Sequence, residues 1–191
     1  FGFQHEEGVK PDIIAISKHF GGGLPISAVC STSKVAETAV NNGYFATRSH
    51  ATDPLLCAAG EESLDIVVDE DMAGKAAKIE KMIKGAFREM AKEFELIGDI
   101  RGRGVLLGIE LVKDRKSKEP ANEETQAIFD YCMDKGLIFQ VRGVRDLKNV
   151  IRLVPPMTTP KDQIDRAISI MYDAVKSVAK GKRRRKAGAH K

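Results

Sequence analysis

The sequence has no tryptophan, and aromatic residues make up only 6% of its 191 residues. Its three cysteines, Cys30, Cys57 and Cys132, lie far apart and form no Cys-x-x-Cys pair. This spacing argues against a disulfide framework or a zinc site, and it favours a reducing compartment, so we predict a cytoplasmic protein. No stretch reaches the roughly 18 apolar residues of a membrane span, and no signal peptide is apparent.

The positive charge is concentrated at one end of the chain. The formal net charge is +4, but seven basic residues lie within 180–191, so the remaining body is mildly acidic and offers no nucleic-acid face. These residues are Lys180, Lys182, Arg183, Arg184, Arg185, Lys186 and Lys191. We predict a disordered tail at 180–191, with a nucleic-acid or membrane contact as the alternative.

What the sequence does contain is an ordinary globular composition, with 42% apolar and 30% charged residues. The length suits one large domain or one and a half. Because Phe1 is not a start residue and the residues after it resemble the interior of a domain, we expect the chain to be cut from a longer protein.

The first half predicts two strands and two helices around an irregular loop. Apolar β-branched runs at 13–17 and 26–31 indicate strands, and helices are expected after Ser33 and from Pro54 to Val68. Between the helices, residues 44–54 show no helical or strand period but carry several hydroxyls. Such a loop suits hydrogen bonding to a ligand.

The second half alternates helices and strands. We expect a long amphipathic helix ending near Phe94, a strand region at 97–112, and a helix from Asn122. Strands at 137–141 and 150–154 and a final helix after Pro160 follow. Within 97–112, Arg101-Gly102-Arg103-Gly104 resembles a phosphate grip, but a strand pair with glycines at tight bends is the favoured interpretation. The fold class is α/β.

Lys18 is the residue around which the functional hypothesis is built. It ends a predicted buried strand and precedes Gly21-Gly22-Gly23. A buried ammonium is costly unless something uses it, and one use is a Schiff base with a carbonyl cofactor. The alternative, equally weighted on the local pattern, is a surface lysine before a glycine turn.

Four separated segments together resemble class III pyridoxal-phosphate-dependent aminotransferases. They are Pro11-Asp12 to Pro25 with the lysine, Ser49-His-Ala-Thr-Asp53-Pro54, Ile97-Gly-Asp to Gly104, and Ile151-Arg152 to Pro155-Pro156. The order holds from residue 1 to about residue 178. Within the family the resemblance is closest to 2,2-dialkylglycine decarboxylase, through the run at 50–54 and the stretch from 97 to 120.

The resemblance implies the C-terminal part of a fold type I transferase that works as a homodimer, with active sites at the subunit interface. Residues 1–70 would end the large cofactor-binding domain, 71–96 would form a linking helix, and 97–179 would form the small domain. The implied reaction moves an amino group between an amino acid or amine and a 2-oxo acid, or decarboxylates 2,2-dialkylglycines.

The resemblance also assigns roles to individual residues. Lys18 would hold pyridoxal 5'-phosphate as the Schiff base and shuttle the substrate proton. Ser49 would donate to the cofactor phosphate from the neighbouring subunit, in place of the family's usual threonine. Arg152 would bind the substrate carboxylate, with an exposed strand arginine as the alternative.

A potassium or sodium ion is a further implied ligand. Asp53 and Ser49 match an alkali-ion site in the decarboxylase, since oxygen ligands suit such an ion. The alternative for Asp53, equally weighted, is a helix cap before Pro54.

Three parts of the family's site would precede Phe1: the acid that pairs with the pyridine nitrogen, the stacking aromatic and the glycine-serine phosphate turn. We therefore predict that these 191 residues alone are inactive. A non-catalytic fragment or pseudoenzyme that acts as a dimerisation or binding module is the competing hypothesis. The sequence leaves open the substrate side chain, and whether Arg152 orients the substrate for transamination or for decarboxylation.

Overall fold

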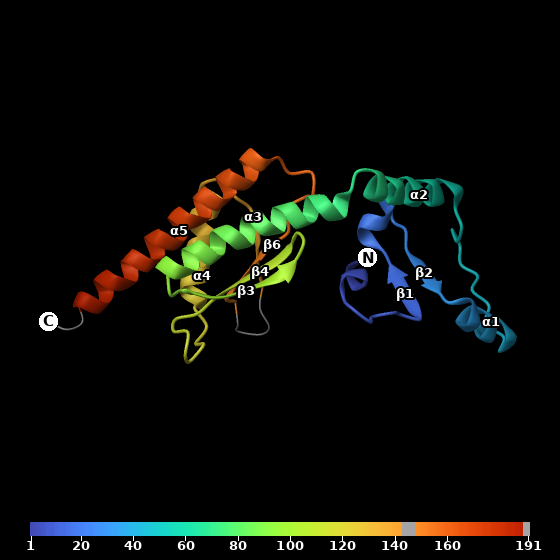
Figure 1. Cartoon of the computed structure of the whole chain (residues 1–191), viewed down its shortest axis with the longest axis horizontal. Helices are drawn as coiled ribbons and strands as arrows, with labels where there is room; N and C mark the ends of the chain where they lie inside the picture. Colours follow the sequence, from blue (N-terminus) through green and yellow to red (C-terminus); the bar gives the residue numbers. More distant parts are fainter. Residues whose placement is uncertain (143–147, 189–191) are drawn as a thin grey trace. The chain divides into compact units, whose positions relative to one another are not determined.

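The computed structural model describes residues 1–142 and 148–188, with side chains described up to Lys180. The chain divides into two compact units, Phe1–Asp71 and Met72–Lys191, here called the N-terminal and the C-terminal unit. Figure 1 labels the elements of both. The sequence predicts the end of a domain at residue 70, next to this division.

The N-terminal unit contains a small antiparallel sheet and helices. Its elements are η1 (Gly2–His5), β1 (Ile13–Ile16), η2 (Lys18–Gly21), β2 (Ala28–Ser31), α1 (Ser33–Asn41) and α2 (Pro54–Asp69). Strands β1 and β2 pair from Ile13 opposite Ser31 to Ile16 opposite Ala28. Helix α2 begins at Pro54, which suits the first helical position because the N–H that proline lacks would have no intrahelical partner there.

Helix α2 packs closely on η2. A Cβ atom on the buried Gly60 would meet Phe20 Cζ at 3.1 Å and Ile26 Cδ1 at 3.3 Å. The missing side chain at this position lets the segment after β1 approach the helix. The strands themselves stay open: Ile13 is 57% and Val29 is 74% exposed. The prediction of a buried strand before Lys18 is therefore wrong for this unit, because two strands leave their faces uncovered.

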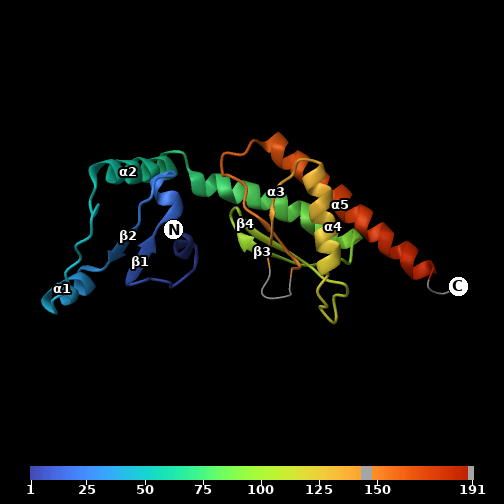
Figure 2. The ribbon, with the colours of Figure 1, turned by 180° about the vertical axis from the view of Figure 1, so that it is seen from behind.

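The C-terminal unit is a four-stranded antiparallel sheet with three helices among the described residues. Its elements are α3 (Met72–Glu93), β3 (Ile97–Arg103), β4 (Leu106–Leu111), α4 (Asn122–Asp134), β5 (Gln140–Arg142), β6 (Val150–Leu153) and α5 (Lys161–Gly188). The strand order is β3-β4-β6-β5. Figures 1 and 2 show the helices grouped at this sheet, and α5 contacts both α3 and α4.

One face of this sheet forms the core. Leu107, Ile109 and Leu111 alternate along β4 and are fully buried, as is Ile151 on β6. They pack with buried side chains of the three helices. Because successive strand residues point to opposite faces, the residues between them lie on the second face, which is half-buried or exposed and carries the polar side chains.

Helix α3 is part of this core. It corresponds to the predicted linking helix 71–96, and its stripe of Ile79, Ile83, Phe87 and Met90 is buried in the C-terminal unit. The helical spacing that predicts an apolar stripe is confirmed.

Two boundaries differ from the predictions. The strand predicted at 137–141 begins only at Gln140, because Gly136, at φ 78°, ends helix α4 and the Leu137 N–H donates to Cys132 O at 2.8 Å. Helix α5 continues through Gly188, past the residue where the sequence predicts a disordered tail. No helix of the described residues is long and apolar enough to cross a membrane.

Candidate active site

Lys18 lies at the surface of the N-terminal unit on an unusual backbone. It is the first residue of η2 and has a φ of 60°. The left-handed region costs a non-glycine residue roughly 1–2 kcal/mol, and such strain gathers at functional sites. Its side chain is exposed and has no hydrogen-bond or ion-pair partner among the described residues. The amine is therefore accessible to a ligand.

A tight turn follows the lysine. Gly22 and Gly23 have φ values of 60° and 111°, which side chains rarely allow. The Ser17 hydroxyl donates to the Ile26 carbonyl oxygen at 3.3 Å and closes the turn. The glycines thus let the chain reverse directly behind the amine.

The loop between α1 and α2 has no helix or strand, as the sequence predicts. Ser49 is exposed, and its hydroxyl has no partner among the described residues. The next residues form a turn in which His50 and Thr52 have positive φ values of 66° and 58°. The Ala51 N–H donates to Arg48 O at 3.1 Å. The lysine segment and this loop, the two stretches that the sequence predicts to bind a cofactor, thus contain three non-glycine residues with a left-handed backbone: Lys18, His50 and Thr52.

Asp53 caps helix α2. The Leu55 N–H donates to its Oδ1 at 3.1 Å, and its Oδ2 lies 3.6 Å from His50 Nδ1. This is the alternative role that the sequence offers for Asp53. The alkali-ion site at Asp53 and Ser49 stays a prediction, and the described residues contain no cluster of three or more His, Cys, Asp or Glu side chains suited to a metal.

Arg152 lies on the polar face of the C-terminal sheet. On β6 it stands opposite Gly108 of β4 and opposite Gln140 of β5. Its Nη1 donates to Gln140 Oε1 at 3.4 Å, a long bond. Arg142, two residues from Gln140 on the same strand, donates to that same oxygen from Nη2 at 2.8 Å and from Nε at 3.1 Å. Two guanidinium groups therefore share one neutral acceptor.

A cleft of about 610 Å³ opens beside this pair of strands. Arg152 and Gln140 line it, together with mostly apolar residues from α3, α5 and the segments next to β5 and β6. Its size falls within the range of small-molecule sites, roughly 300–1,000 Å³. The α3 and α5 residues in its wall belong to the hydrophobic core, so the cleft lies on the core side of the sheet.

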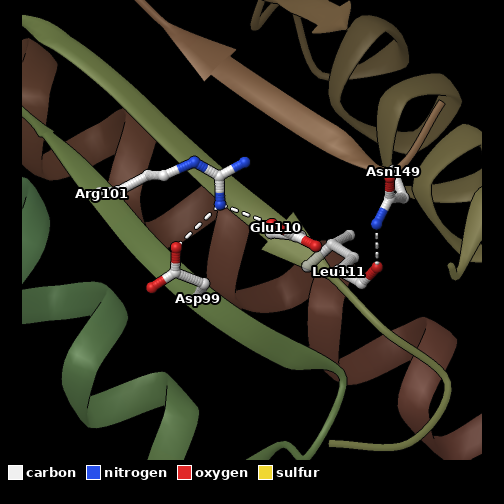
Figure 3. A network of polar contacts seen from close by, with 5 residues as sticks. All are labelled: Asp99, Arg101, Glu110, Leu111 and Asn149. Carbon is white, nitrogen blue, oxygen red and sulfur yellow. Dashed lines mark hydrogen bonds and ion pairs between the residues drawn. The ribbon is translucent and has the colours of Figure 1, made fainter. Parts of the chain in front are cut away.

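A different arginine on the same sheet is already neutralised. The Arg101 guanidinium lies between Asp99 and Glu110 (Figure 3) and forms ion pairs with both. Its hydrogen bonds to Asp99 and then to Glu110 raise the pKa of Arg101. Arg101 is committed to internal carboxylates, so it offers less to a ligand than Arg152 does.

Asn149 fixes the start of the strand that carries Arg152. It is buried, and its side-chain Nδ2 donates to Leu111 O at 2.9 Å (Figure 3). The backbone carbonyl oxygen of Asn149 accepts from the Leu111 N–H at 2.8 Å. The side-chain amide thus extends the β4–β6 ladder by one residue pair. This sets the register that places Arg152 opposite Gly108.

The hairpin between β3 and β4 confirms the strand pair favoured for 97–112. Gly102 has a φ of 121°, and a Cβ atom there would lie 2.1 Å from Leu106 O. Helix α3 holds the turn: Lys84 Nζ donates to Gly102 O at 2.6 Å, and Glu80 accepts from the Gly104 N–H. These glycines serve the turn geometry.

The structure describes each predicted residue within its own unit. Lys18, Ser49 and Asp53 belong to the N-terminal unit and Arg152 to the C-terminal unit. Sequence reasoning missed Gln140 and Arg142. Their alternation as Gln-x-Arg at the end of an apolar run is the period of a strand with one polar face, and this signal could have identified them.

Comparisons with known proteins agree on one family. A family model described as aminotransferase class-III matches residues 1–175. A leucine/methionine racemase of Thermococcus litoralis is 33% identical over 183 residues, which are 95% of this chain and 40% of that protein. An alanine–glyoxylate aminotransferase 2 homologue of Arabidopsis thaliana is 34% identical over 171 residues, 90% of this chain and 35% of that protein.

A solved structure gives the same result. The crystal structure of a Bacillus anthracis aminotransferase matches with a TM-score of 0.83 and 31% identity, over 93% of this chain and 41% of that one. The predicted fold class, α/β as in the C-terminal part of a fold type I transferase, is confirmed. The chain spans about 40% of the length of the relatives it matches.

Proposed function

Since the chain belongs to the aminotransferase class-III family, whose members depend on pyridoxal phosphate, we propose that it forms the C-terminal part of an aminotransferase. The proposed reaction moves an amino group between an amino acid or amine and a 2-oxo acid. The observation that carries the proposal is Lys18, an exposed amine on a left-handed backbone directly before a glycine turn. A primary amine of this kind fits the cofactor's aldehyde.

Lys18 has two tasks in this proposal. When bound, the cofactor supplies a ring that withdraws electrons from the substrate Cα. Lys18 would hold the cofactor through its amine, and the same amine would act as the general base that takes the proton from the substrate Cα. The exposed Ser49 hydroxyl would donate to a cofactor phosphate oxygen from the neighbouring subunit of a homodimer.

Arg152 binds the substrate carboxylate. Its planar guanidinium suits two parallel hydrogen bonds to a carboxylate, and its one long bond to Gln140 at 3.4 Å leaves most of its donors for a ligand. By fixing the carboxylate, Arg152 would also orient the other bonds of the substrate Cα.

Two finer versions of the proposal are separated by product analysis. Decarboxylation, with an alkali ion at Ser49 and Asp53, predicts release of carbon dioxide from 2-aminoisobutyrate. Racemisation, the activity in the name of the Thermococcus litoralis relative, would use the same Lys18 proton transfer and predicts exchange of the substrate Cα hydrogen with solvent without a net change of amino group.

Borohydride labelling tests the proposal. The full-length enzyme with pyridoxal phosphate is reduced and digested, and the cofactor adduct is located by mass spectrometry. We expect the label on Lys18 and none on Lys10, an exposed lysine of the same unit. A label on another lysine would contradict the proposal and favour a non-catalytic dimerisation module. The 191-residue chain alone should show no turnover.

A further inference from the structure

Two positively charged side chains, Arg142 and Arg152, share a neutral acceptor, the amide oxygen of Gln140. Gln140 Oε1 receives three N–H donors from them, at 2.8, 3.1 and 3.4 Å. Within residues 1–142 and 148–180, no carboxylate lies within ion-pair distance of either guanidinium. Arg101 on the same sheet has two such carboxylates, Asp99 and Glu110.

This arrangement favours an external anion. A neutral amide oxygen is a weaker acceptor for a guanidinium than a carboxylate, because charge-assisted hydrogen bonds are about twice as strong. Both guanidinium groups already reach one oxygen atom, so a single carboxylate placed there would accept hydrogen bonds from both. It would also reduce the repulsion between the two positive charges.

The residue opposite Arg152 is small. Gly108, opposite Arg152 on β4, carries no side chain, and a Cβ atom there would meet nothing closer than 3.5 Å. The Arg152 side chain is also only half-buried, so a ligand can reach it from the polar face of the sheet.

We infer that Arg142 and Arg152 form a two-guanidinium site for one carboxylate, and that Gln140 positions Arg142 within it. The inference rests on the proposed function and extends it, since it adds a second binding arginine and names the substrate class. Amino acids and 2-oxo acids share the carboxylate that the site recognises, and the pair selects them over amines and aldehydes that lack one.

Arg142→Gln tests the second arginine. In the full-length enzyme loaded with cofactor, we expect the KM for amino acid and 2-oxo acid to rise about five- to tenfold, the loss of one hydrogen bond to a charged group at a partly exposed site. The kcat/KM ratio of these substrates over 1-phenylethylamine and an aldehyde should fall by the same factor. Arg88→Gln, at an exposed arginine of α3, is the control and should keep the ratio.

Gln140→Glu tests the shared acceptor without removing an arginine. The new carboxylate has the size of the amide and occupies the two guanidinium groups itself, so it should compete with the ligand. Calorimetry with propionate should give a dissociation constant about tenfold or more above that of the parent enzyme, with propionamide as the uncharged control. In the Arg142→Gln background, the same substitution should have a smaller effect.

The outcomes separate this inference from the proposed function. If Arg152→Gln raises the KM for carboxylate substrates but Arg142→Gln does not, the two-guanidinium site is wrong and the proposed function stands. If Arg152→Gln also leaves these KM values unchanged, the proposed carboxylate site fails as a whole. An equal loss with 1-phenylethylamine would indicate a folding defect and contradict the inference for Arg142, while Gln140→Glu still tests the acceptor.

Discussion

The two units differ in how completely they bury their apolar residues. All buried hydrophobic residues among those described lie from Met72 onward, while the N-terminal unit exposes large apolar side chains such as Val29, Val40 and Phe45 at 74%, 65% and 83%. The C-terminal unit therefore closes its own core. The N-terminal unit leaves its apolar side chains exposed, and we expect another surface to cover them in the full-length protein.

The difference also divides the proposed chemistry. Lys18, with its strained backbone, lies in the unit that has no buried hydrophobic residues among those described. Arg152 lies on a strand that pairs with β4 in the packed sheet of the C-terminal unit. In the proposed function, the N-terminal unit would supply the reactive group and the C-terminal unit the residue that binds the substrate carboxylate. Substitutions should accordingly affect activity in one unit and stability in the other.

The largest effect is expected at Lys18. Lys18→Arg keeps the positive charge, but a guanidinium neither condenses readily with an aldehyde nor serves as a base near neutral pH. We expect kcat of the full-length enzyme to fall by at least about 10³-fold, with little change in the melting temperature because the side chain is exposed. Lys10→Arg is the matched control. A retained kcat would show that the amine of Lys18 is dispensable.

Two isoleucines on strands test the burial difference itself. Ile151 on β6 is 0% exposed and Ile13 on β1 is 57% exposed. In the 191-residue chain, Ile151→Ala should lower the free energy of unfolding by about 2–5 kcal/mol, and Ile13→Ala by less than about 1 kcal/mol. Chemical denaturation followed by circular dichroism measures both.

The same two substitutions, measured in the full-length enzyme, test whether another surface covers β1. If another surface covers β1 there, Ile13→Ala should become clearly more costly, while the cost of Ile151→Ala should stay the same. An equal, small cost of Ile13→Ala in both settings would mean that the exposed strand is not an interface.

Two asparagines give a smaller effect. Asn149 is buried and donates to Leu111 O, and Asn42 is exposed and donates to Thr38 O at 2.7 Å. Asn149→Ala removes one of the two donors to Leu111 O, which keeps the Ala121 N–H at 3.2 Å, so we expect a loss of about 1–1.5 kcal/mol. Asn42→Ala should cost less than about 0.5 kcal/mol. Similar values for the two would contradict the role of Asn149 in setting the β4–β6 register.

Sequence patterns predicted local structure better than they predicted burial. The apolar stripe of α3 and the strand pair within 97–112 were both predicted, and the structure confirms both. The exposure of Ile13 could not be deduced from the sequence, because an apolar strand is buried only when another element covers it, and the strand's own residues do not show whether one does. The start of β5 was predicted too early, because the residue after Gly136 belongs to the end of helix α4: the Leu137 N–H donates to Cys132 O.

The sequence could identify candidate site residues where the side chain itself has the required chemical group, such as an amine or a guanidinium. Lys18 and Arg152 were nominated by motif, and their roles stay predictions. Gln140 was missed because its importance lies in what it touches: its oxygen meets Arg142 and Arg152 only after two strands separated by a loop have paired. Pairwise contacts of this kind depend on register, which the sequence of one strand does not fix.

The smallest effect concerns Glu80, which ties helix α3 to the β3–β4 turn. Hydrogen bonds from Lys84 and then from the Gly104 N–H lower the pKa of Glu80 below its ordinary value of 4.5. A carboxylate with a lowered pKa stabilises the fold above its unfolded pKa, and this contribution is lost as the pH falls through the folded pKa. Glu80→Gln should therefore cost about 1 kcal/mol at pH 7 and progressively less below pH 4.5. Denaturation of the variant at pH 7 and pH 3 measures this, with Glu37→Gln on α1 as the control from the N-terminal unit; a cost that does not shrink at pH 3 would show that the charge of Glu80 is not what holds the turn.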